Sequence, residues 1–275
     1  MAECCPFGEH ASAVCGASRV ARLPTVNHDA SCWAFFVGAM MSRLHLVVGL
    51  ALLVPGSAWA GDSDFFAGLD MSGGLASGSS STTDGGAAFA GGGVVGNVRF
   101  DGTVGIGGHV GYRFDPSWSA FVSYEHIRGG VSWDASFPLY GVTSDFDGDA
   151  TSNVVLANLA HDWALSDTTT IGANAGLGLS INSLSGIVET DRGTGLFLSD
   201  VEDHTHLSPA ARLGVGLQHK IAPNVILGLN AAVSYVGGFE TGDMRSGNLG
   251  VTAITPYKID DVWRSSLGAS LKVAF

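Results

Sequence analysis

Residues 170–181 read Thr-Ile-Gly-Ala-Asn-Ala-Gly-Leu-Gly-Leu-Ser-Ile, and they carry the clearest structural pattern in the chain. Apolar residues occupy every second position from Ile171 to Ile181, and Thr, Gly, Asn and Ser occupy the positions between them. Side chains of a β-strand point alternately to two faces, so one face of this segment is apolar and the other is small and polar. This pattern is typical of a barrel strand that meets lipid on one face and lines a narrow lumen with the other.

The alternation recurs along the chain and predicts eight strands. They are expected at 64–74, 103–114, 117–128, 152–164, 169–182, 205–221, 225–237 and 260–275. The connections alternate between short turns, at 115–116, 166–167 and 222–224, and long segments at about 75–102, 129–151, 183–204 and 238–259. Outer-membrane barrels have short periplasmic turns and long loops outside the cell.

We therefore predict an all-β fold, an eight-stranded antiparallel transmembrane β-barrel with short periplasmic turns and four long, mobile, acidic extracellular loops. Six or ten strands remain open, because the Gly- and Ser-rich stretch 73–93 could hide or extend a strand. A secreted periplasmic β-sandwich is the alternative outside the membrane, since a half-buried soluble sheet also alternates.

A secretory signal precedes the alternating region. Met41 begins a short basic segment, residues 44–54 form an apolar run, and Ala58-Trp59-Ala60 gives the small-x-small pattern of a cleavage site. We expect residues 41–60 to be a cleavable signal peptide for export through the Sec pathway and residues 61–275 to be the barrel domain.

The first forty residues fit poorly in front of such a signal. Residues 1–40 contain all four cysteines and no clear periodicity. We expect them to be a spurious or untranslated extension, with translation starting at Met40 or Met41. The barrel domain then has no disulfide framework and no thiolate metal site. We expect no cofactor and no metal.

The chain is acidic. It carries 25 Asp and Glu against 13 Lys and Arg, a formal net charge of −12. Binding to the phosphate backbone of nucleic acids depends on neutralisation by Lys and Arg. The composition therefore argues against nucleic acid as a partner.

Aromatic side chains gather near the predicted strand ends, where amphipathic rings prefer the level of the lipid headgroups. The set on the turn side comprises Tyr112, Phe114, Trp118, Trp163 and Phe275. The set on the loop side comprises Tyr124, Tyr235 and Trp263. These sets predict two aromatic girdles, although aromatic residues are also common in ordinary strands.

Charged residues fall on positions predicted to face the lumen. Glu125, Arg212 and Arg264 lie at similar distances from the short turns, and Asp70, Asn158 and Asn230 are candidates to join them. Charges in a narrow lumen are costly unless they are paired. We interpret the set as a structural plug of ion pairs; the alternative is a gate in a small channel.

Two further motifs suggest chemistry but are incomplete. The motif His204-x-His206-x-Ser208 is superficially similar to the His-x-Ser pair of lipid A deacylases, but Pro209 replaces the Asn that follows the serine in that family. Residues 145–149, Asp-Phe-Asp-Gly-Asp, resemble a fragment of a calcium loop without its terminal Glu, which favours a solvated acidic loop.

The segment Gly107-Gly-His-Val-Gly-Tyr-Arg-Phe114, followed by a tight turn and Ala120-Phe-Val-Ser-Tyr124, resembles the second and third strands of eight-stranded barrels of the outer-membrane-protein-A and opacity-protein type. The segment that ends in Phe275 resembles the C-terminal insertion signal of these proteins. The resemblance implies an outer-membrane location and insertion by the barrel assembly machinery, and no peptidoglycan-binding domain is expected.

That family implies no single activity. We expect a structural or surface-interaction protein, of surface-antigen or adhesin type, that is not an enzyme. Its expected partners are the lipid bilayer, lipopolysaccharide and an extracellular ligand at the loops. The alternatives are a small porin-like channel or a pathway for apolar solutes and, less favoured, a lipid A-modifying esterase.

Overall fold

The computed structural model describes residues 64–84, 93–138, 141–248 and 250–275. The predicted extension 1–40, the signal peptide 41–60 and its cleavage positions Ala58 and Ala60 lie outside the described residues. Among the described residues, no helix is long and apolar enough to cross a membrane.

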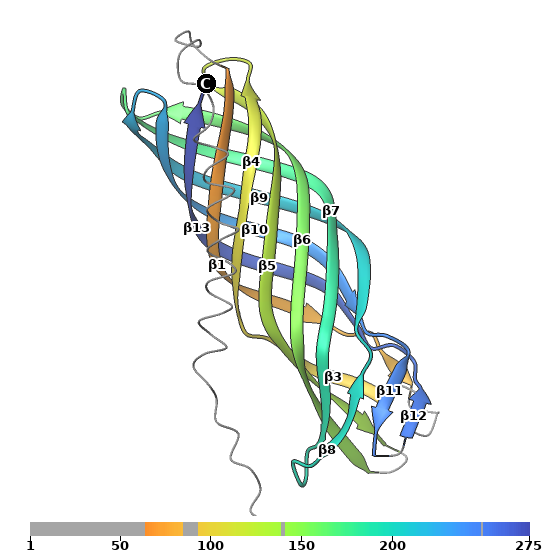
Figure 1. The fold of residues 1–275 in the computed structure, drawn as a ribbon. Coiled ribbons are helices and arrows are strands. Elements are labelled where there is room, and N and C mark those ends of the chain that lie inside the picture. Colours follow the sequence, from red (N-terminus) through yellow and green to blue (C-terminus); the bar gives the residue numbers. More distant parts are fainter. Residues whose placement is uncertain (1–63, 85–92, 139–140, 249) are drawn as a thin grey trace, which may run out of the picture. The chain divides into compact units, whose positions relative to one another are not determined.

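Eight strands form a closed antiparallel ring (Figure 1). They are β1 (Phe65–Ser79), β4 (Gly102–Arg113), β5 (Trp118–Phe137), β6 (Val142–Ala164), β7 (Thr169–Asp191), β9 (His204–Ala222), β10 (Val225–Glu240) and β13 (Lys258–Ala274). Each pairs with the next, and β13 pairs with β1 from Ala274↔Phe66 to Asp260↔Ser79, which closes the ring. The predicted eight-stranded antiparallel barrel is confirmed.

The outward face of the ring is apolar. Leu75, Leu177 and Leu267 are each more than 70% exposed, and other Leu, Val and Ile side chains on this face are also exposed. Water would penalise such a surface, whereas lipid accepts it, and a closed ring satisfies every backbone group that lipid cannot. We call this face of the ring the apolar band.

The long connections are mostly strand rather than open loop, which differs from the expectation. The strands β5, β6 and β7 run on well past the apolar band. Five shorter strands join them: β2 (Thr83–Asp84), β3 (Gly93–Phe100), β8 (Phe197–Val201), β11 (Met244–Gly247) and β12 (Gly250–Ala253). We call the described residues within 76–101, 126–153, 183–206 and 236–262 the crown (lower end of Figure 1).

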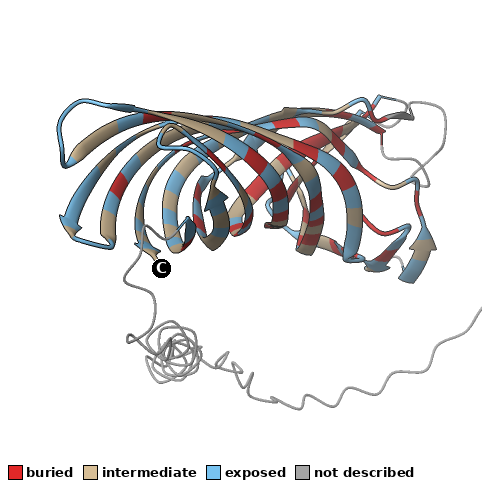
Figure 2. Ribbon diagram, turned by 90° about the horizontal axis from the view of Figure 1, so that it is seen from above, coloured by how far each residue is buried: buried red, intermediate tan, exposed pale blue. Residues whose placement is uncertain are grey.

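The inward face changes character along each strand. On β5, inward positions near the turns are mostly polar, as at Ser119, Ser123 and Glu125 with Phe121 among them, but the same face continues in the crown as Val131 and Trp133. The apolar core of the protein lies in the crown, and Figure 2 shows that buried positions become frequent towards that end. The two-residue alternation continues, but its apolar side switches from outside to inside.

Candidate functional site

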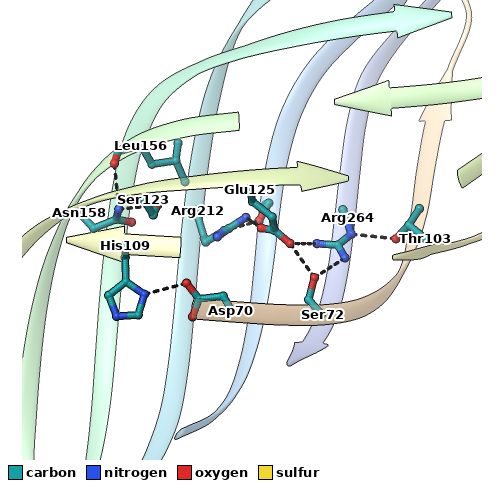
Figure 3. A network of polar contacts seen from close by, with 11 residues as sticks. Asp70, Ser72, Thr103, His109, Ser123, Glu125, Leu156, Asn158, Arg212 and Arg264 are labelled. Carbon is teal, nitrogen blue, oxygen red and sulfur yellow. Dashed lines mark hydrogen bonds and ion pairs between the residues drawn. The ribbon is translucent and has the colours of Figure 1, made fainter. Parts of the chain in front are cut away.

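A layer of ion pairs crosses the lumen where the polar interior gives way to the crown core (Figure 3). The carboxylate of Glu125 on β5 accepts a hydrogen bond from Nη1 of Arg264 at 3.0 Å and pairs through its other oxygen with Nη2 of Arg212. Glu125 is 7% exposed and Arg264 is 1% exposed. One buried carboxylate therefore bridges guanidinium groups from two other strands, β9 and β13.

Hydroxyl groups hold this layer in place. The Ser72 hydroxyl donates to Glu125 at 2.6 Å and accepts from Nη2 of Arg264 at 2.7 Å. Nε of Arg264 donates to Thr103 at 2.8 Å, and Nε of Arg212 donates to Ser234 at 2.9 Å. Sequence reasoning missed these three hydroxyls, although each lies at an inward position of its strand. The pairing and added hydrogen bonds offset the desolvation of the charges.

The other three predicted members of the cluster lie elsewhere. Nδ1 of His109 donates a hydrogen bond to the carboxylate of Asp70 at 2.7 Å. The Asn158 amide donates to the Ser123 hydroxyl at 3.0 Å. Asn230 lines the lumen on the turn side of the layer. The structure thus brings Glu125, Arg212 and Arg264 together and leaves the remaining three outside their hydrogen-bonded layer.

A polar chamber of about 150 Å³ lies on the turn side of the ion-pair layer. Its wall includes the Asp70–His109 pair and a chain in which Nζ of Lys272 donates to Gln218 at 2.5 Å and Gln218 donates to Asp162 at 3.1 Å. A chamber of this volume with polar walls holds on the order of ten water molecules.

On the crown side the lumen is apolar. A cavity of about 20 Å³ lies beside Arg264, lined by side chains that include Phe100, Ile127 and Phe239. Deeper in the crown core the rings of Trp133 and Phe146 stack at a centroid distance of 5.3 Å, and the Tyr257 ring packs on Phe146 at 4.8 Å. Two successive barriers, one of ion pairs and one of packed aromatic rings, therefore close the lumen.

The tip of the crown is tied together by Arg192. Its guanidinium donates to Asp134 at 2.7 Å and to both carboxylate oxygens of Asp145. Burial opposes ionisation of Asp134, but the hydrogen bonds from Asn97 and Arg192 prevail and hold the pKa of Asp134 below its usual value. The predicted acidic loop at 145–149 is wrong in this respect, because Asp145 and Asp149 lie on β6 and pair with arginines.

A buried ion pair lies inside the crown. Glu189, 2% exposed, accepts from Nη1 of Arg245 at 3.1 Å and from the Ser199 hydroxyl at 2.5 Å. Burial, together with the negative charge of Glu189, raises the pKa of Tyr257 far above its usual value. The crown therefore has the composition of a folded domain, with an apolar core and paired buried charges.

The predicted girdle residues lie on the outer surface at both ends of the apolar band. Tyr112 packs on Phe65 at a ring distance of 4.9 Å, and Trp118 and Trp163 flank His161 at 4.6 and 4.5 Å. Phe114 and Phe275 are exposed at the turn end. At the other end, the Tyr235 ring lies 5.2 Å from Trp263, and the Tyr124 hydroxyl donates to Asn153 at 2.8 Å.

The side chains of the candidate esterase motif contact other groups. The Ser208 hydroxyl donates to the carbonyl of Gly238 at 3.3 Å and accepts from its N–H at 3.1 Å. The charged neighbour of His206 is Glu240, at 3.7 Å. The contacts of the described residues include no hydrogen bond between His206 and Ser208, which is the contact that would pair this serine with a base. Among all the described residues, no group of three or more His, Cys, Asp or Glu side chains could hold a metal ion.

No family model and no curated protein matches the sequence. Among solved structures, the chain is similar to the Neisserial surface protein A, at 17% identity and a TM-score of 0.41, over 77% of this chain and 97% of that one. It is also similar to the outer membrane protein OprG from Pseudomonas aeruginosa, at 13% identity and a TM-score of 0.48, over 78% and 97%. The third similar structure is Ail of Yersinia pestis in complex with sucrose octasulfate, at 15% identity and a TM-score of 0.38, over 77% and 99%.

The strand pairing and the surface of this chain are sufficient to identify the type of barrel. An even number of antiparallel strands closes into a ring, short turns occupy one end, and the outward face is apolar between two sets of aromatic residues. Bacterial outer-membrane barrels are built in this way. The protein is an eight-stranded transmembrane β-barrel of the bacterial outer membrane.

Proposed function

We propose that this protein is a non-conducting outer-membrane barrel that presents its folded crown at the cell surface for interaction with other molecules, as a surface antigen or adhesin-like protein does. One observation carries the proposal: the lumen is closed twice, and the second closure is the core of the crown itself. The buried apolar residues of the fold stabilise the crown and do not line an open pathway through the barrel.

The lumen supports this proposal over the channel alternative. An ion moving through the barrel would have to displace the Glu125 layer and then pass the packed rings of Trp133, Phe146 and Tyr257. An apolar solute that entered from the crown end would meet the packed rings first and the Glu125 layer second. The cavity of about 20 Å³ beside Arg264 holds about one water molecule and no larger solute.

The crown supports a role in recognition. Its predicted loops are folded as paired strands, and Arg192 ties the β5–β6 hairpin to the segment after β7. A surface that is already ordered loses less conformational entropy when a partner binds. The crown is therefore better suited to specific contact than four open loops would be.

We further propose that the outer face contacts the bilayer and lipopolysaccharide, and that the last strand, ending in Phe275, is read by the barrel assembly machinery. Phe275 is exposed, and its N–H donates to the carbonyl of Phe65 at 3.0 Å. Export through the signal at 41–60 belongs to the same proposal, and N-terminal sequencing of the mature protein tests it, with Gly61 expected as the first residue.

Single cysteines test the orientation of the crown. The sequence after residue 60 has no cysteine, so in the mature chain that begins at Gly61 Val251→Cys in the crown and Ser117→Cys at a short turn each give one thiol. A membrane-impermeant maleimide should label the crown cysteine in intact cells and the turn cysteine only after the outer membrane is opened. The reverse pattern would contradict the proposal.

Conductance tests the seal. The refolded barrel in a planar bilayer should give no stepwise current at salt concentrations that resolve small pores. Steady unit conductance from the unmodified protein would favour the channel instead.

A further inference from the structure

The strand β12 has one free edge in the part of the chain that the structure describes. Its four residues pair with β11, from Gly250↔Gly247 to Ala253↔Met244, and with no other strand of the described residues. In an antiparallel pair, the backbone groups of alternate residues point towards the partner and away from it. The N–H of Ile254 donates to the carbonyl of Asp243 at 2.7 Å, which fixes the phase of this alternation.

That phase directs the backbone N–H and C=O groups of Val251 and Ala253 away from β11. The described contacts give these groups no partner. Proteins usually protect a free edge with charged side chains, proline or a covering segment. The residues of β12, Gly-Val-Thr-Ala, include neither charge nor proline, and Val251 is 69% exposed. This edge is open to strand addition by an extended peptide.

The surroundings of the edge are acidic. Asp200 on β8 pairs in register with Ser246 on β11, which pairs with Val251, so the three lie in one row across the sheet with Asp200 about 10 Å from the edge strand. Asp243 and Glu202 are exposed nearby in the chain, before β11 and after β8. The basic residue of these strands, Arg245, is 7% exposed and pairs with Glu189.

The crown as a whole is also acidic. The ranges that define it contain fifteen Asp and Glu against five Lys and Arg. Of these bases, Arg128, Arg192, Arg245 and Lys258 each form an ion pair within the crown. A partner strand with Lys or Arg side chains would therefore meet complementary charge, and an acidic strand would be repelled.

We propose that the free edge of β12 binds an extended cationic peptide segment of another protein, which adds an antiparallel or parallel strand to the β8–β11–β12 sheet. This inference rests on the proposed exposure of the crown at the cell surface. The backbone of Val251 and Ala253 supplies the hydrogen bonds. Asp200, Glu202 and Asp243 select for positive charge.

The backbone part is tested with proline. Ala253→Pro removes one outward-pointing N–H and leaves the ladder with β11 intact, because edge strands tolerate proline on their free side. The full barrel in detergent micelles is titrated with a fluorescent peptide of alternating Lys and Val, and binding is followed by anisotropy. We expect Ala253→Pro to weaken binding at least tenfold while heat-modifiable gel mobility stays unchanged. Unchanged binding would overturn strand addition.

The charge part is tested with Asp200→Asn combined with Asp243→Asn. We expect at least a threefold loss of affinity for the Lys-Val peptide at low salt and little change at high salt, because screening removes the same attraction. An alternating Glu-Val peptide of the same length should bind neither form. Equal affinity for both peptides would overturn the preference for cations.

Two other outcomes have distinct meanings. If the unmodified barrel forms a dimer that Ala253→Pro abolishes, the occupant of the edge is a second copy of this chain, and the proposal is overturned. If the peptide binds as expected in micelles but the Val251→Cys thiol is not labelled in intact cells, strand addition at β12 is supported. The proposed exposure of the crown at the cell surface is then contradicted. The two proposals can therefore fail separately.

Discussion

Glu125 and Arg264 stand 139 positions apart in the sequence, and their side chains meet at 3.0 Å in the lumen. Glu125 lies on β5 and Arg264 on β13, which are not neighbours in the ring. The contact therefore crosses the lumen rather than following the wall. It marks the level at which the chamber on the turn side ends and the packed core of the crown begins.

Replacing Glu125 with Gln should destabilise the barrel without opening it. The substitution leaves the buried Arg264 and the partly buried Arg212 near each other with no carboxylate, and breaking a buried ion pair in this way costs about 3–5 kcal/mol. The midpoint of urea unfolding in micelles should fall clearly. Conductance should stay absent because the crown core still blocks the lumen; a pore in this single variant would show that the ion pairs are the only barrier.

The crown core should prove to be the second barrier. Trp133→Ala removes a large ring that is 2% exposed and stacked on Phe146, and such a truncation costs about 3–5 kcal/mol. We expect Trp133→Ala alone to leave the barrel closed and the double variant with Glu125→Gln to admit ions. If the double variant folds, as judged by gel mobility, and still conducts nothing, a further obstruction closes the lumen.

The sequence predicted the ring well because lipid imposes a simple rule. Alternation with an apolar outside is the direct consequence of a hydrocarbon solvent, so strands such as 169–182 could be placed from residue types alone. The charged layer could be anticipated for a similar reason, since Glu125, Arg212 and Arg264 fall on the opposite parity from the lipid face. Their hydroxyl partners needed cross-strand register, which the sequence does not state.

The crown escaped prediction because the rule reverses there. Outside the bilayer, water surrounds the barrel, so Val131 and Trp133 face inward instead of outward. Because the apolar face changes from the outer to the inner side of each strand, the crown strands lack the pattern of the barrel strands and were predicted as loops. Short strands such as β8 and β12 carry too few residues for a periodic signal and depend on pairing with distant segments.

Asp134 should make the crown less stable at acidic pH. Its pKa is held below the usual value, so its ion pair with Arg192 contributes stability above the pKa of an unfolded aspartate, about 4, and this contribution is lost as the pH falls through the folded pKa. Limited proteolysis with an acid-tolerant protease should cut the crown faster at pH 3 than at pH 6. Asp134→Asn should reduce that difference, and an unchanged difference would exclude Asp134 as its source.

Two glycines on β4 should differ in how strongly replacement by alanine destabilises the barrel. A Cβ at Gly105 would overlap the carboxylate of Glu125 and the hydroxyl of Ser72, whereas a Cβ at Gly102 would meet no atom within 4 Å. Gly105→Ala must therefore push the ion-pair layer apart, at a cost of about 1–3 kcal/mol. Gly102→Ala should change the free energy of unfolding by no more than about 0.5 kcal/mol. Urea unfolding of both variants in the same micelles measures the difference, and equal stability would mean that the layer has room which its contacts do not reveal.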